Sequence, residues 1–478
     1  MTTDGWETVI GLEVHVELAT ATKLFSGAPN HFGAAPNTNV DPTSLGLPGS
    51  LPVLNERAVE LAIRVGLALH CDVRPSTFAR KNYFYPDMPK DFQISQFDEP
   101  INVGGWLELP SGTRIGITRA HLEEDTGKTT HVGGSGRIGG ADHALVDYNR
   151  AGVPLLEIVG EPDLRSSDDA RAYVEELRQI LVAIGASDGK MEEGSLRVDA
   201  NVSVRRPGEP FGTRCEIKNV NSLRSLGRAI DYEAARQIDL VTDGGTVRQE
   251  TRHWDEASGR TLPGRSKEDA EDYRYFLEPD LVPVVPDPAW IERIRAELPP
   301  LPAERRAALA AAAGRPPSDG EVVVAVARGL DDLAVRAIGL GADPARVLTH
   351  VEHNLAVDGA ADLTPTAFAA LVALETSGAL TATQTKDVLA TLVAEGGAGD
   401  PAAIAAAKGY EAMASDALAD AVDAVIADNP AEWARYVEGD EKARGKLTGF
   451  FVGQVMKRTR GQADGKAVTA LLAARADG

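Results

Sequence analysis

The sequence predicts an α+β protein in which a strand-rich first part is followed by an alanine-rich, helical second part. Three observations support this fold class. Several stretches before residue 290 alternate apolar and polar residues with a period of two, which is typical of strands that bury one face. After a proline-rich linker at 298–302, the sequence becomes alanine-rich and helical. At 478 residues the chain is too long for one hydrophobic core, so two to three domains are expected.

The first predicted strand covers residues 9–18. Its apolar residues share one parity and are expected to cover a core, whereas Glu13, His15 and Glu17 share the other parity. Neighbours on that polar face are about 6.6 Å apart, at a rise of about 3.3 Å per residue. Taken alone, this pattern also fits the solvated outer face of an antiparallel strand.

Two further predicted strands carry carboxylates in the same way. Residues 195–205 alternate, with Arg197, Asp199 and Asn201 on the polar parity, and residues 114–125 end in Glu123, Glu124 and Asp125. An ordinary surface would intersperse lysine among the acids, and these faces contain almost none. Because hard divalent cations prefer several oxygen ligands, the three strands predict a metal site.

Three helices are expected among these strands. Asn55 begins the first, Ser167 caps a second that Gly185 closes, and the third spans residues 223–241. The glycine-rich stretch 130–141 contains the pattern G-x-G-x-x-G at 134–139. No helix signal follows it, so we expect a loop rather than a dinucleotide site. The sequence also contains no phosphate-binding P-loop.

Composition limits the functional classes. The formal net charge of −22 argues against indiscriminate nucleic-acid binding, so an RNA partner would have to meet local basic patches. Cys71 and Cys215 are too few for a disulfide scaffold. The chain starts without a basic, apolar leader and has no apolar run of about 18 residues. We therefore expect a cytoplasmic protein without a membrane span.

Three segments are rich in basic side chains, and two of them also contain several aromatic residues. Residues 80–90 hold three aromatic and three basic side chains, which suits stacking on a nucleotide terminus but equally a buried loop anchored by tyrosines. Residues 265–276 have the same mixture. Residues 442–466 hold seven basic side chains and one acid, which predicts phosphate contacts or, alternatively, a solvated helix end.

These motifs give the chain a close resemblance to a known family, nearly from end to end. They are GLEVHVEL at 11–18, RKNYFYP at 80–86, HLEED at 121–125, DYRYF at 272–276 and GFFVGQVM at 449–456, together with residues 191–201. The chain resembles the B subunit (GatB) of the tRNA-dependent amidotransferase, which converts Glu-tRNA(Gln) or Asp-tRNA(Asn) into Gln-tRNA(Gln) or Asn-tRNA(Asn).

The resemblance implies a heterotrimer with divided labour. A partner glutaminase, the amidase subunit (A), releases ammonia from glutamine, and a small third subunit (C) bridges the two larger chains. The B subunit is the kinase and transferase part, in which ATP phosphorylates the side-chain carboxylate of the misacylated tRNA and ammonia displaces the phosphate. The implied fold is a cradle of antiparallel strands at 1–292, an all-helical domain at 293–400 and a small helical tail at 401–478 that contacts tRNA.

The resemblance also assigns site residues. The catalytic candidates are Glu13, His15, Lys81 and Glu124. The first candidates for metal ligands are Glu13, His15 and Glu124, and the second choices are Glu123, Glu157 and Asp199. ATP or the ester's carboxylate would be held by Lys90, Arg150, Arg197 and Asn201. The expected cation is Mg²⁺, which prefers oxygen ligands. Because His15 offers nitrogen, either the ion is a softer one such as Mn²⁺ or His15 steers ammonia into the acyl phosphate.

The chain departs from many relatives at a four-cysteine zinc site near the N-terminus. Those positions read Ser26, Ala28, Asp41 and Ser44, so no thiolate remains and no zinc is expected. We expect packing alone to hold this loop. Neither cysteine of the chain has an obvious catalytic triad, so the ammonia must come from a partner.

Three alternatives remain open at this point. An archaeal paralogue specific for Glu-tRNA(Gln) is longer, and residues 275–301 leave no room for its inserted domain. A non-catalytic tRNA-binding scaffold would use the carboxylate faces only for ion pairs with Arg and Lys. A free-standing carboxylate kinase for a small molecule is disfavoured by the basic residues after 442.

Overall fold

The computed structural model describes residues 5–133, 140–264, 273–410, 415–439, 441–459, 463 and 465–477. The chain divides into two compact units, Met1–Ala303 and Glu304–Gly478. The described strands all lie in the first unit, and the second is helical, so the predicted α+β class is confirmed. The glycine-rich pattern at 134–139 and the predicted segment 265–272 lie outside the described residues.

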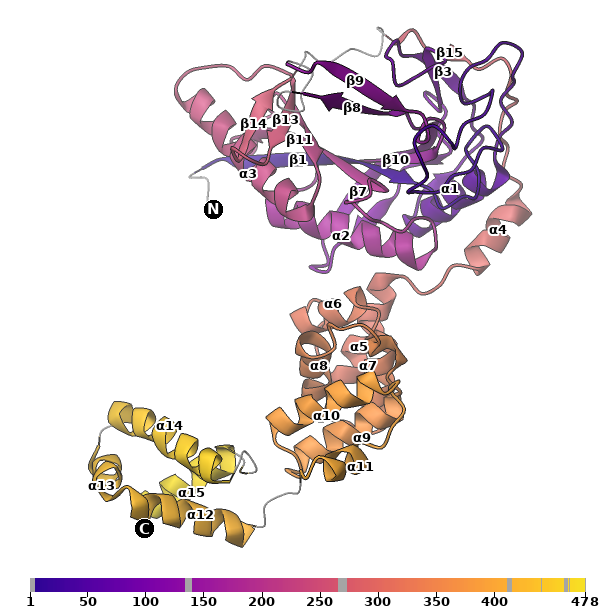
Figure 1. Ribbon diagram of the computed structural model, residues 1–478. Helices are drawn as coiled ribbons and strands as arrows, with labels where there is room; N and C mark the ends of the chain where they lie inside the picture. The colour runs from indigo at the N-terminus through magenta and orange to yellow at the C-terminus, as the bar shows by residue number, and fades with distance from the viewer. Residues whose placement is uncertain are drawn as a thin grey trace. The chain divides into compact units, whose positions relative to one another are not determined.

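One large sheet organises the first unit (Figure 1). Its order is β14-β13-β12-β11-β1-β10-β7-β4-β3-β15, with β2, β5 and β6 attached beside this path. The described pairs are antiparallel except β12 with β13, which run parallel. The strands of this sheet are β1 (Glu7–Glu17), β2 (Asp72–Val73), β3 (Ala79–Asn82), β4 (Phe92–Ser95), β5 (Asn102–Val103), β6 (Trp106–Glu108), β7 (Arg114–Glu124), β10 (Pro154–Gly160), β11 (Leu196–Arg205), β12 (Cys215–Val220), β13 (Thr251–Asp255), β14 (Arg260–Pro263) and β15 (Phe276–Leu277).

Strand β1 has the predicted division between an apolar and a polar face. Its apolar side chains are almost fully buried, whereas Glu13, His15 and Glu17 are only half-buried. Helices α1 (Glu56–Ala68), α2 (Ser167–Ala183) and α3 (Leu223–Thr242) contribute to the core on the apolar side, and α2 lies below the sheet in Figure 1. The separate hairpin of β8 (Lys128–Val132) and β9 (His143–Asp147) lies on the other side. The polar face is therefore not covered by the three helices.

The helix ends follow from local capping. Asn55 accepts hydrogen bonds from the backbone N–H groups of Arg57 and Ala58, as predicted for the start of α1. The cap of α2 is Ser166 rather than the predicted Ser167, because the Ser166 hydroxyl accepts from the backbone N–H of Asp169. Gly185 follows the end of α2 with a φ of 68°, a left-handed conformation that glycine adopts without strain.

The first unit extends past the predicted boundary at 292. Helix α4 (Pro288–Ala296) places Ile294 in the core of the sheet unit.

In the second unit, one hydrophobic core extends to Ala405, beyond the predicted boundary at 400, and another begins at Leu418. The helices of the second unit are α5 (Pro302–Ala313, which starts at the boundary), α6 (Gly320–Ala327), α7 (Asp331–Gly339), α8 (Pro344–His353), the 3-10 helix η2 (Ala360–Asp362), α9 (Pro365–Thr376), α10 (Ala382–Ala394), α11 (Pro401–Ala407), α12 (Ser415–Asp428), α13 (Pro430–Glu438), α14 (Glu441–Arg458) and α15 (Gly465–Asp477). Within the described part of the chain, no helix combines the length and the apolar character needed to span a bilayer.

Candidate active site

The polar face of the sheet arranges side chains in rows that cross neighbouring strands. One row joins four strands in register: Arg197 on β11, His15 on β1, Glu157 on β10 and His121 on β7. The adjacent row places Asp199 opposite Glu13. Residues in register on adjacent strands project to the same side of a sheet, so strands distant in sequence supply one continuous polar surface.

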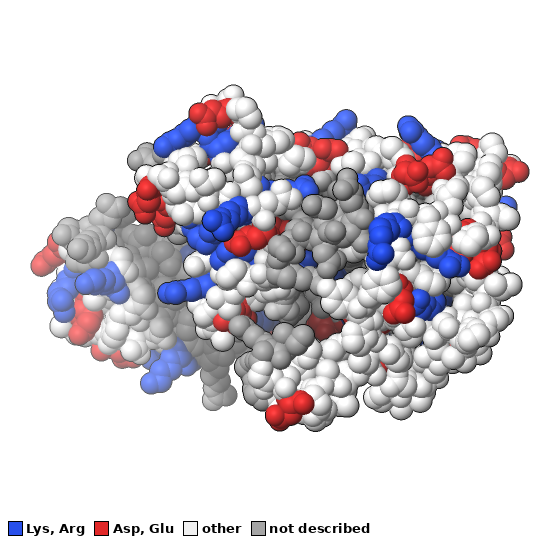
Figure 2. All heavy atoms as spheres, turned by 90° about the horizontal axis from the view of Figure 1, so that it is seen from above, with Lys and Arg blue, Asp and Glu red and all other residues white. Residues whose placement is uncertain are grey.

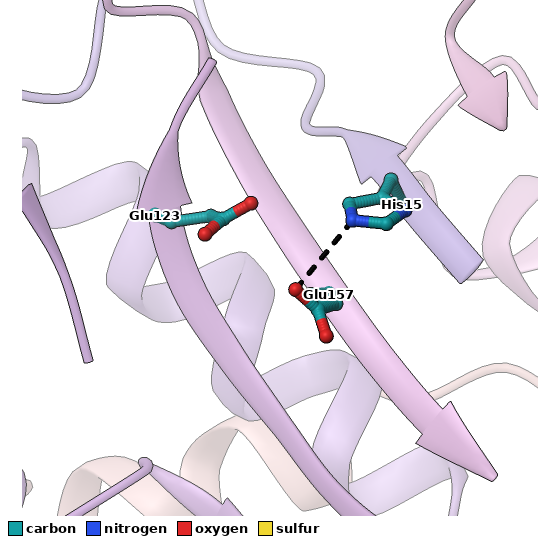
Figure 3. A group of neighbouring side chains, drawn as sticks. All are labelled: His15, Glu123 and Glu157. Atoms are coloured by element: carbon teal, nitrogen blue, oxygen red, sulfur yellow. Dashed lines mark ion pairs between the residues drawn. The ribbon is translucent and has the colours of Figure 1, made fainter. Parts of the chain in front are cut away.

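Three side chains of this surface converge from three strands. His15 on β1, Glu123 on β7 and Glu157 on β10 each offer a ligand atom, and these atoms lie within 4.8 Å of one another (Figure 3). His15 Nε2 is 3.5 Å from Glu157 Oε2. His121 Nε2 lies 3.7 Å from a Glu157 oxygen and 3.9 Å from a Glu123 oxygen. Two imidazoles and two carboxylates therefore meet at one point of the face.

The convergent group lies in a cavity of about 560 Å³. Four basic side chains line the same cavity: Lys81, Arg119, Arg214 and Lys218. Figure 2 looks onto the unit from above and shows Lys and Arg side chains interspersed with Asp and Glu around a hollow. A cavity of this volume is large enough for a nucleotide-sized ligand, and its mixed charge suits a ligand that carries phosphate together with a bound cation.

Burial and mutual charge fix the protonation states of the group. Burial alone would lower the pKa of His15, but the contact with Glu157 outweighs it and raises that pKa to about 9. Burial alone would raise the pKa of Glu157, but the imidazoles of His121 and His15 hold it well below its usual range. Burial lowers the pKa of His121. At neutral pH, His15 thus carries a proton beside the Glu157 carboxylate, and a divalent cation could replace that proton.

The structure brings five of the predicted site residues into this cavity. Those that line it are Glu13, His15, Lys81, Glu123 and Glu157. The parity of the first strand was sufficient to predict that Glu13 and His15 share a face. The other predicted site residues are not among the described residues that line the cavity, and their contacts with neighbouring side chains explain where they lie.

Glu124 and Lys90, two further residues of the predicted site, contact each other away from the convergent group. Glu124 is buried on the opposite face, where its Oε1 lies 2.5 Å from Lys90 Nζ and accepts the Ile94 backbone N–H at 2.8 Å. Neither residue is among the described residues that line the cavity. The structure thus pairs Glu124 with Lys90 outside the described lining of this cavity, and their roles as metal ligand and clamp stay predictions.

A bulge explains why Glu123, and not Glu124, faces the cavity. Ile115 and Ile117 on β7 are buried, and counting parity from them would place Glu124 on the polar face. The register of β7 against β10 shifts between Val159 and Gly160, so the parity of β7 changes along the strand. After the shift, Leu122 faces the core and Glu123 faces the cavity.

Arg150 and Arg197 are committed to a neighbouring carboxylate rather than available as clamps. Arg197 Nη2 is 2.6 Å from Asp125 Oδ2, and Arg150 Nε is 3.4 Å from the same oxygen. Arg150 also donates to the carbonyls of Thr126 and Gly127. These contacts tie both arginines to the loop that follows β7, and their role in holding ATP stays a prediction.

Asp199 and Asn201 lie beside the cavity, and each contacts a side chain that lines it. Lys218 Nζ is 2.6 Å from Asp199 Oδ2, so this carboxylate is paired with a cation of the cavity wall. Asn201 Nδ2 donates to Glu13 Oε1 at 2.9 Å. Asn201 lines a second, smaller cavity of about 170 Å³, and Glu13 lines both cavities. Asn201 thus contacts Glu13 and is not among the described residues that line the larger cavity.

Several cavity residues were not predicted. His121 shares the parity of Glu123, so the HLEED motif contained a signal for it. Phe97, Tyr273 and Tyr275 form an aromatic wall of the cavity. Tyr273 and Tyr275 belong to the segment 265–276, whose mixture of aromatic and basic side chains was noted from the sequence, whereas Phe97 lies outside both such segments. Phe84, from the motif at 80–86, is 62% exposed and is not among the described lining residues.

The loop that lacks the zinc ligands is held by polar contacts, so the expectation of packing alone is wrong. The Ser44 backbone N–H donates to Asp41 Oδ1 at 2.8 Å. The pKa of Asp41 is lowered. Burial alone would raise it, but hydrogen bonds from Ser44 and Ser26 and the charge of Lys23 outweigh burial. Lys23 is 1% exposed and donates to the Tyr148 carbonyl at 3.2 Å. A buried cation and hydroxyl groups organise this loop.

Comparisons with known proteins show the family to which the chain is similar. A sequence model of the GatB/GatE catalytic domain matches residues 8–292, and a model of the GatB domain matches residues 347–475. Among curated relatives, the B subunit of the Asp/Glu-tRNA(Asn/Gln) amidotransferase from Frankia casuarinae is 52% identical, covering 98% of this chain and 95% of the relative. The proteins of the same description from Kineococcus radiotolerans and Salinispora arenicola are 50% and 51% identical, each over 98% of this chain and over 97% and 96% of the relative.

Proposed function

Because the chain belongs to the GatB family, the B subunits of the Asp/Glu-tRNA(Asn/Gln) amidotransferases, we propose that it performs the kinase and transferase steps of tRNA-dependent transamidation. A carboxylate oxygen of the amino acid on Glu-tRNA(Gln) or Asp-tRNA(Asn) attacks the terminal phosphorus of ATP, which releases ADP. Ammonia then attacks the acyl carbon, phosphate leaves, and the nitrogen loses one proton to give the amide. The observation that carries this proposal is the convergence of His15, Glu123 and Glu157 in a cavity lined by cations.

The convergent group fits a divalent cation. Ligands of one octahedral Mg²⁺ are about 4.2 Å apart when opposite and about 3 Å apart when adjacent, so the three ligand atoms, which lie within 4.8 Å of one another, would draw closer around a bound ion. The group offers nitrogen as well as oxygen, which suits Mn²⁺ better than Mg²⁺. His15, Glu123 and Glu157 would hold the ion, and His121 is placed to support both carboxylates. The ion would supply positive charge between the nucleotide phosphates and the attacking carboxylate.

The phosphoryl step needs further positive charge from the chain, because two anions must approach each other. Lys81 and Arg119 line the cavity together with the carboxylates and would neutralise phosphate oxygens. Lys81 Nζ lies 4.8 Å from the centre of the Tyr273 ring, which orients the cation at the cavity wall. This arrangement favours phosphoryl transfer without a P-loop.

The amidation step needs an acceptor for the N–H groups of the incoming nitrogen. Glu13 lies between the two cavities, and the hydrogen bond from Asn201 fixes its carboxylate. We assign Glu13 to orienting ammonia and accepting its proton. The positions of Glu13 and the His15 group in one cavity would place nitrogen and acyl phosphate in contact.

Ammonia would be supplied by a partner. Burial raises the pKa of the Cys71 thiol to about 12 and that of Cys215 to about 11, so neither thiol is poised as a nucleophile for glutamine hydrolysis. This supports a heterotrimer with an amidase subunit and a small third subunit, in keeping with the description of the relatives as B subunits of a larger enzyme. We place this assembly in the cytoplasm, with ATP and Mg²⁺ or Mn²⁺ as its requirements.

The tail provides a candidate surface for tRNA. On α14, the side chains of Lys446, Lys457 and Arg458 are exposed. Arg458 also pairs with Asp428 at 2.8 Å, whereas the side chain of Lys442 and residues 460 and 464 of the predicted basic cluster lie outside the described residues. Exposed cations on one helix suit phosphate contacts in an otherwise acidic protein.

Two adjacent glutamates provide the experiment. Glu123→Gln and Glu124→Gln are made in the complex assembled with its amidase partner, and transfer of the labelled terminal phosphate of ATP to Glu-tRNA is measured. We expect Glu123→Gln to reduce this transfer by about 10²- to 10³-fold while glutamine hydrolysis continues. Glu124→Gln should keep the transfer per folded complex but reduce stability by about 3 kcal/mol, since it leaves the buried Lys90 charge unpaired.

The pair of variants separates chemistry from scaffolding. If Glu123→Gln retains full transfer and loses only stability, the chain is a tRNA-binding scaffold and the proposed chemistry is wrong. If Glu124→Gln abolishes transfer in a complex that remains folded, the cavity has been assigned to the wrong face of β7.

A further inference from the structure

Arg214 is a cation of the cavity wall that the proposed phosphoryl and amide steps do not use. It directly precedes β12, it is exposed, and it lines both the larger and the smaller cavity. Among the described residues it has no hydrogen-bond or ion-pair partner, whereas Lys218 on the same strand pairs with Asp199 at 2.6 Å. A guanidinium that the protein does not neutralise is available to an anionic ligand.

The cations that would neutralise ATP lie on the opposite side of the convergent group from Arg214. Arg119 is on β7 and Lys81 on β3, and the order β12-β11-β1-β10-β7 puts four strand steps between Arg214 and Arg119. At about 4.8 Å per step, the backbones of these two arginines are about 19 Å apart along the sheet. His15 on β1 and Glu157 on β10 come between them in this order. The cavity therefore offers two separate cationic positions, one on each side of the convergent group.

The proposed reaction brings two polyanions to this one cavity. One is ATP, and the other is the tRNA end, where the last phosphodiester lies one ribose away from the aminoacyl ester. Two polyanions that shared one group of cations would repel each other, so the second needs a cation at a distance from the first. In a chain with a net charge of −22, the RNA end also needs a local cation to approach the surface at all.

We propose that Arg214 binds the phosphodiester that joins the last two nucleotides of the misacylated tRNA. This assignment rests on the proposed function, which brings the tRNA ester to the cavity. The phosphodiester then lies toward β12, the terminal phosphate of ATP lies toward β7, and the ester lies between them. An arginine suits this contact, because its planar fork donates two parallel N–H groups to one phosphate. Arg214 thereby sets the direction from which the substrate carboxylate meets ATP.

The test measures equilibrium binding by the complex assembled with its partner subunits, at several salt concentrations. The probes are a tRNA ending in CCA, the same tRNA ending in CC, which lacks this phosphodiester, and ADP. Arg214→Gln removes the charge, and Arg214→Lys keeps it. Arg224→Gln is the control, because Arg224 is exposed, has no ion-pair partner among the described residues and is not one of the described residues that line this cavity.

The expected effect is confined to one probe. Arg214→Gln should weaken binding of CCA-tRNA by about 10-fold and reduce the magnitude of its salt slope by about 0.7, the value for one phosphate of a single strand. Binding of CC-tRNA and of ADP should remain unchanged, and Arg214→Lys should restore the salt slope. Contacts elsewhere on the tRNA are common to both tRNA probes, so their difference reports the terminal phosphodiester.

Four results would overturn the assignment. Unchanged binding of CCA-tRNA excludes the contact, equal weakening of CC-tRNA places it elsewhere on the RNA, and weaker binding of ADP assigns Arg214 to ATP instead. An equal effect of Arg224→Gln would mean that only the total charge matters. Phosphate transfer by Glu123→Gln is measured separately, so failure of the proposed chemistry and failure of this contact are distinguishable.

Discussion

Two histidine–glutamate pairs in this chain make similar contacts in very different surroundings. On the sheet, His15 Nε2 is 3.5 Å from Glu157 Oε2. In the helical unit, His350 Nε2 is 2.8 Å from Glu375 Oε2, and the imidazole is 1% exposed. A single pair of this kind therefore does not indicate a site.

The polar groups around the helical pair are paired with one another. The Arg346 guanidinium pairs with the Glu375 carboxylate, and Asn354 lies 3.0 Å from His350 Nδ1. Burial would raise the pKa of Glu375, but the hydrogen bonds from His350 and Arg346 outweigh it and lower that pKa. These four residues join α8, the residue that caps its end and α9. The cluster is structural because its partners satisfy one another.

The surroundings of the sheet pair are open and incompletely used. His121 Nδ1 and Gln96 Nε2 have no hydrogen-bond partner among the described residues, and both side chains line the cavity. Buried polar groups are normally satisfied, and the helical cluster contains no unpartnered atom of this kind among the described residues. Within the described part of the chain, the two clusters therefore differ in that the sheet cluster borders a cavity and contains buried polar atoms without a partner, whereas the helical cluster contains none.

The largest difference between the two pairs should appear in catalysis. Replacing Glu157 with Gln removes a carboxylate from the convergent group, and we expect ammonium-dependent amide formation to fall by about 10²- to 10³-fold. Glu375→Gln, the equivalent change in the helical unit, should leave the rate within twofold, about 0.4 kcal/mol. Steady-state rates of the assembled complex check both. Equal losses in the two variants would remove the distinction.

A smaller difference should appear in stability and its pH dependence. We expect Glu375→Gln to reduce the free energy of unfolding of the helical unit by about 1–2 kcal/mol at pH 7, because His350 and Arg346 lose a charged acceptor. The pKa of Glu375 lies below its ordinary value of 4.5, so this contribution is complete above about pH 4.5 and is lost as the pH falls through the folded-state pKa. Urea unfolding at several pH values measures it, and a stability difference that grows on acidification would contradict the assignment.

The smallest difference concerns the two buried histidines themselves. His121 Nε2 contacts Glu157 and Glu123 only at 3.7 and 3.9 Å, and its Nδ1 lacks a partner among the described residues, so His121→Asn should change the free energy of unfolding by no more than about 0.5 kcal/mol. His350→Asn loses the contacts to Glu375 and Asn354 and should cost about 1–3 kcal/mol. Thermal unfolding of the two variants provides the comparison. A greater loss for His121 would mean that the sheet cluster is as structural as the helical one.

Strand parity accounts for how much of the site could be predicted. The alternation of residues 9–18 was enough to place Glu13 and His15 on the accessible face, and the α+β class followed from the same patterns. The choice between Glu123 and Glu124 was not accessible in this way, because the register shift opposite Val159 reverses the parity of β7. The commitment of Arg150 and Arg197 to Asp125 is a contact between segments distant in sequence, and no local pattern encodes it.

The two margins of the large sheet have a consequence for assembly. The outermost strands are β14 and β15; β15 contains only Phe276 and Leu277, and β14 ends with Pro263, which has no amide hydrogen. A long, regular margin would offer unpaired backbone groups to a second copy of the chain. Here the strands are long at the centre of the sheet, where four of them align their side chains in rows. They are short at the two margins, where a strand of another sheet could pair with them. The protein can therefore maintain a broad, ordered platform for chemistry while offering little backbone to aggregation.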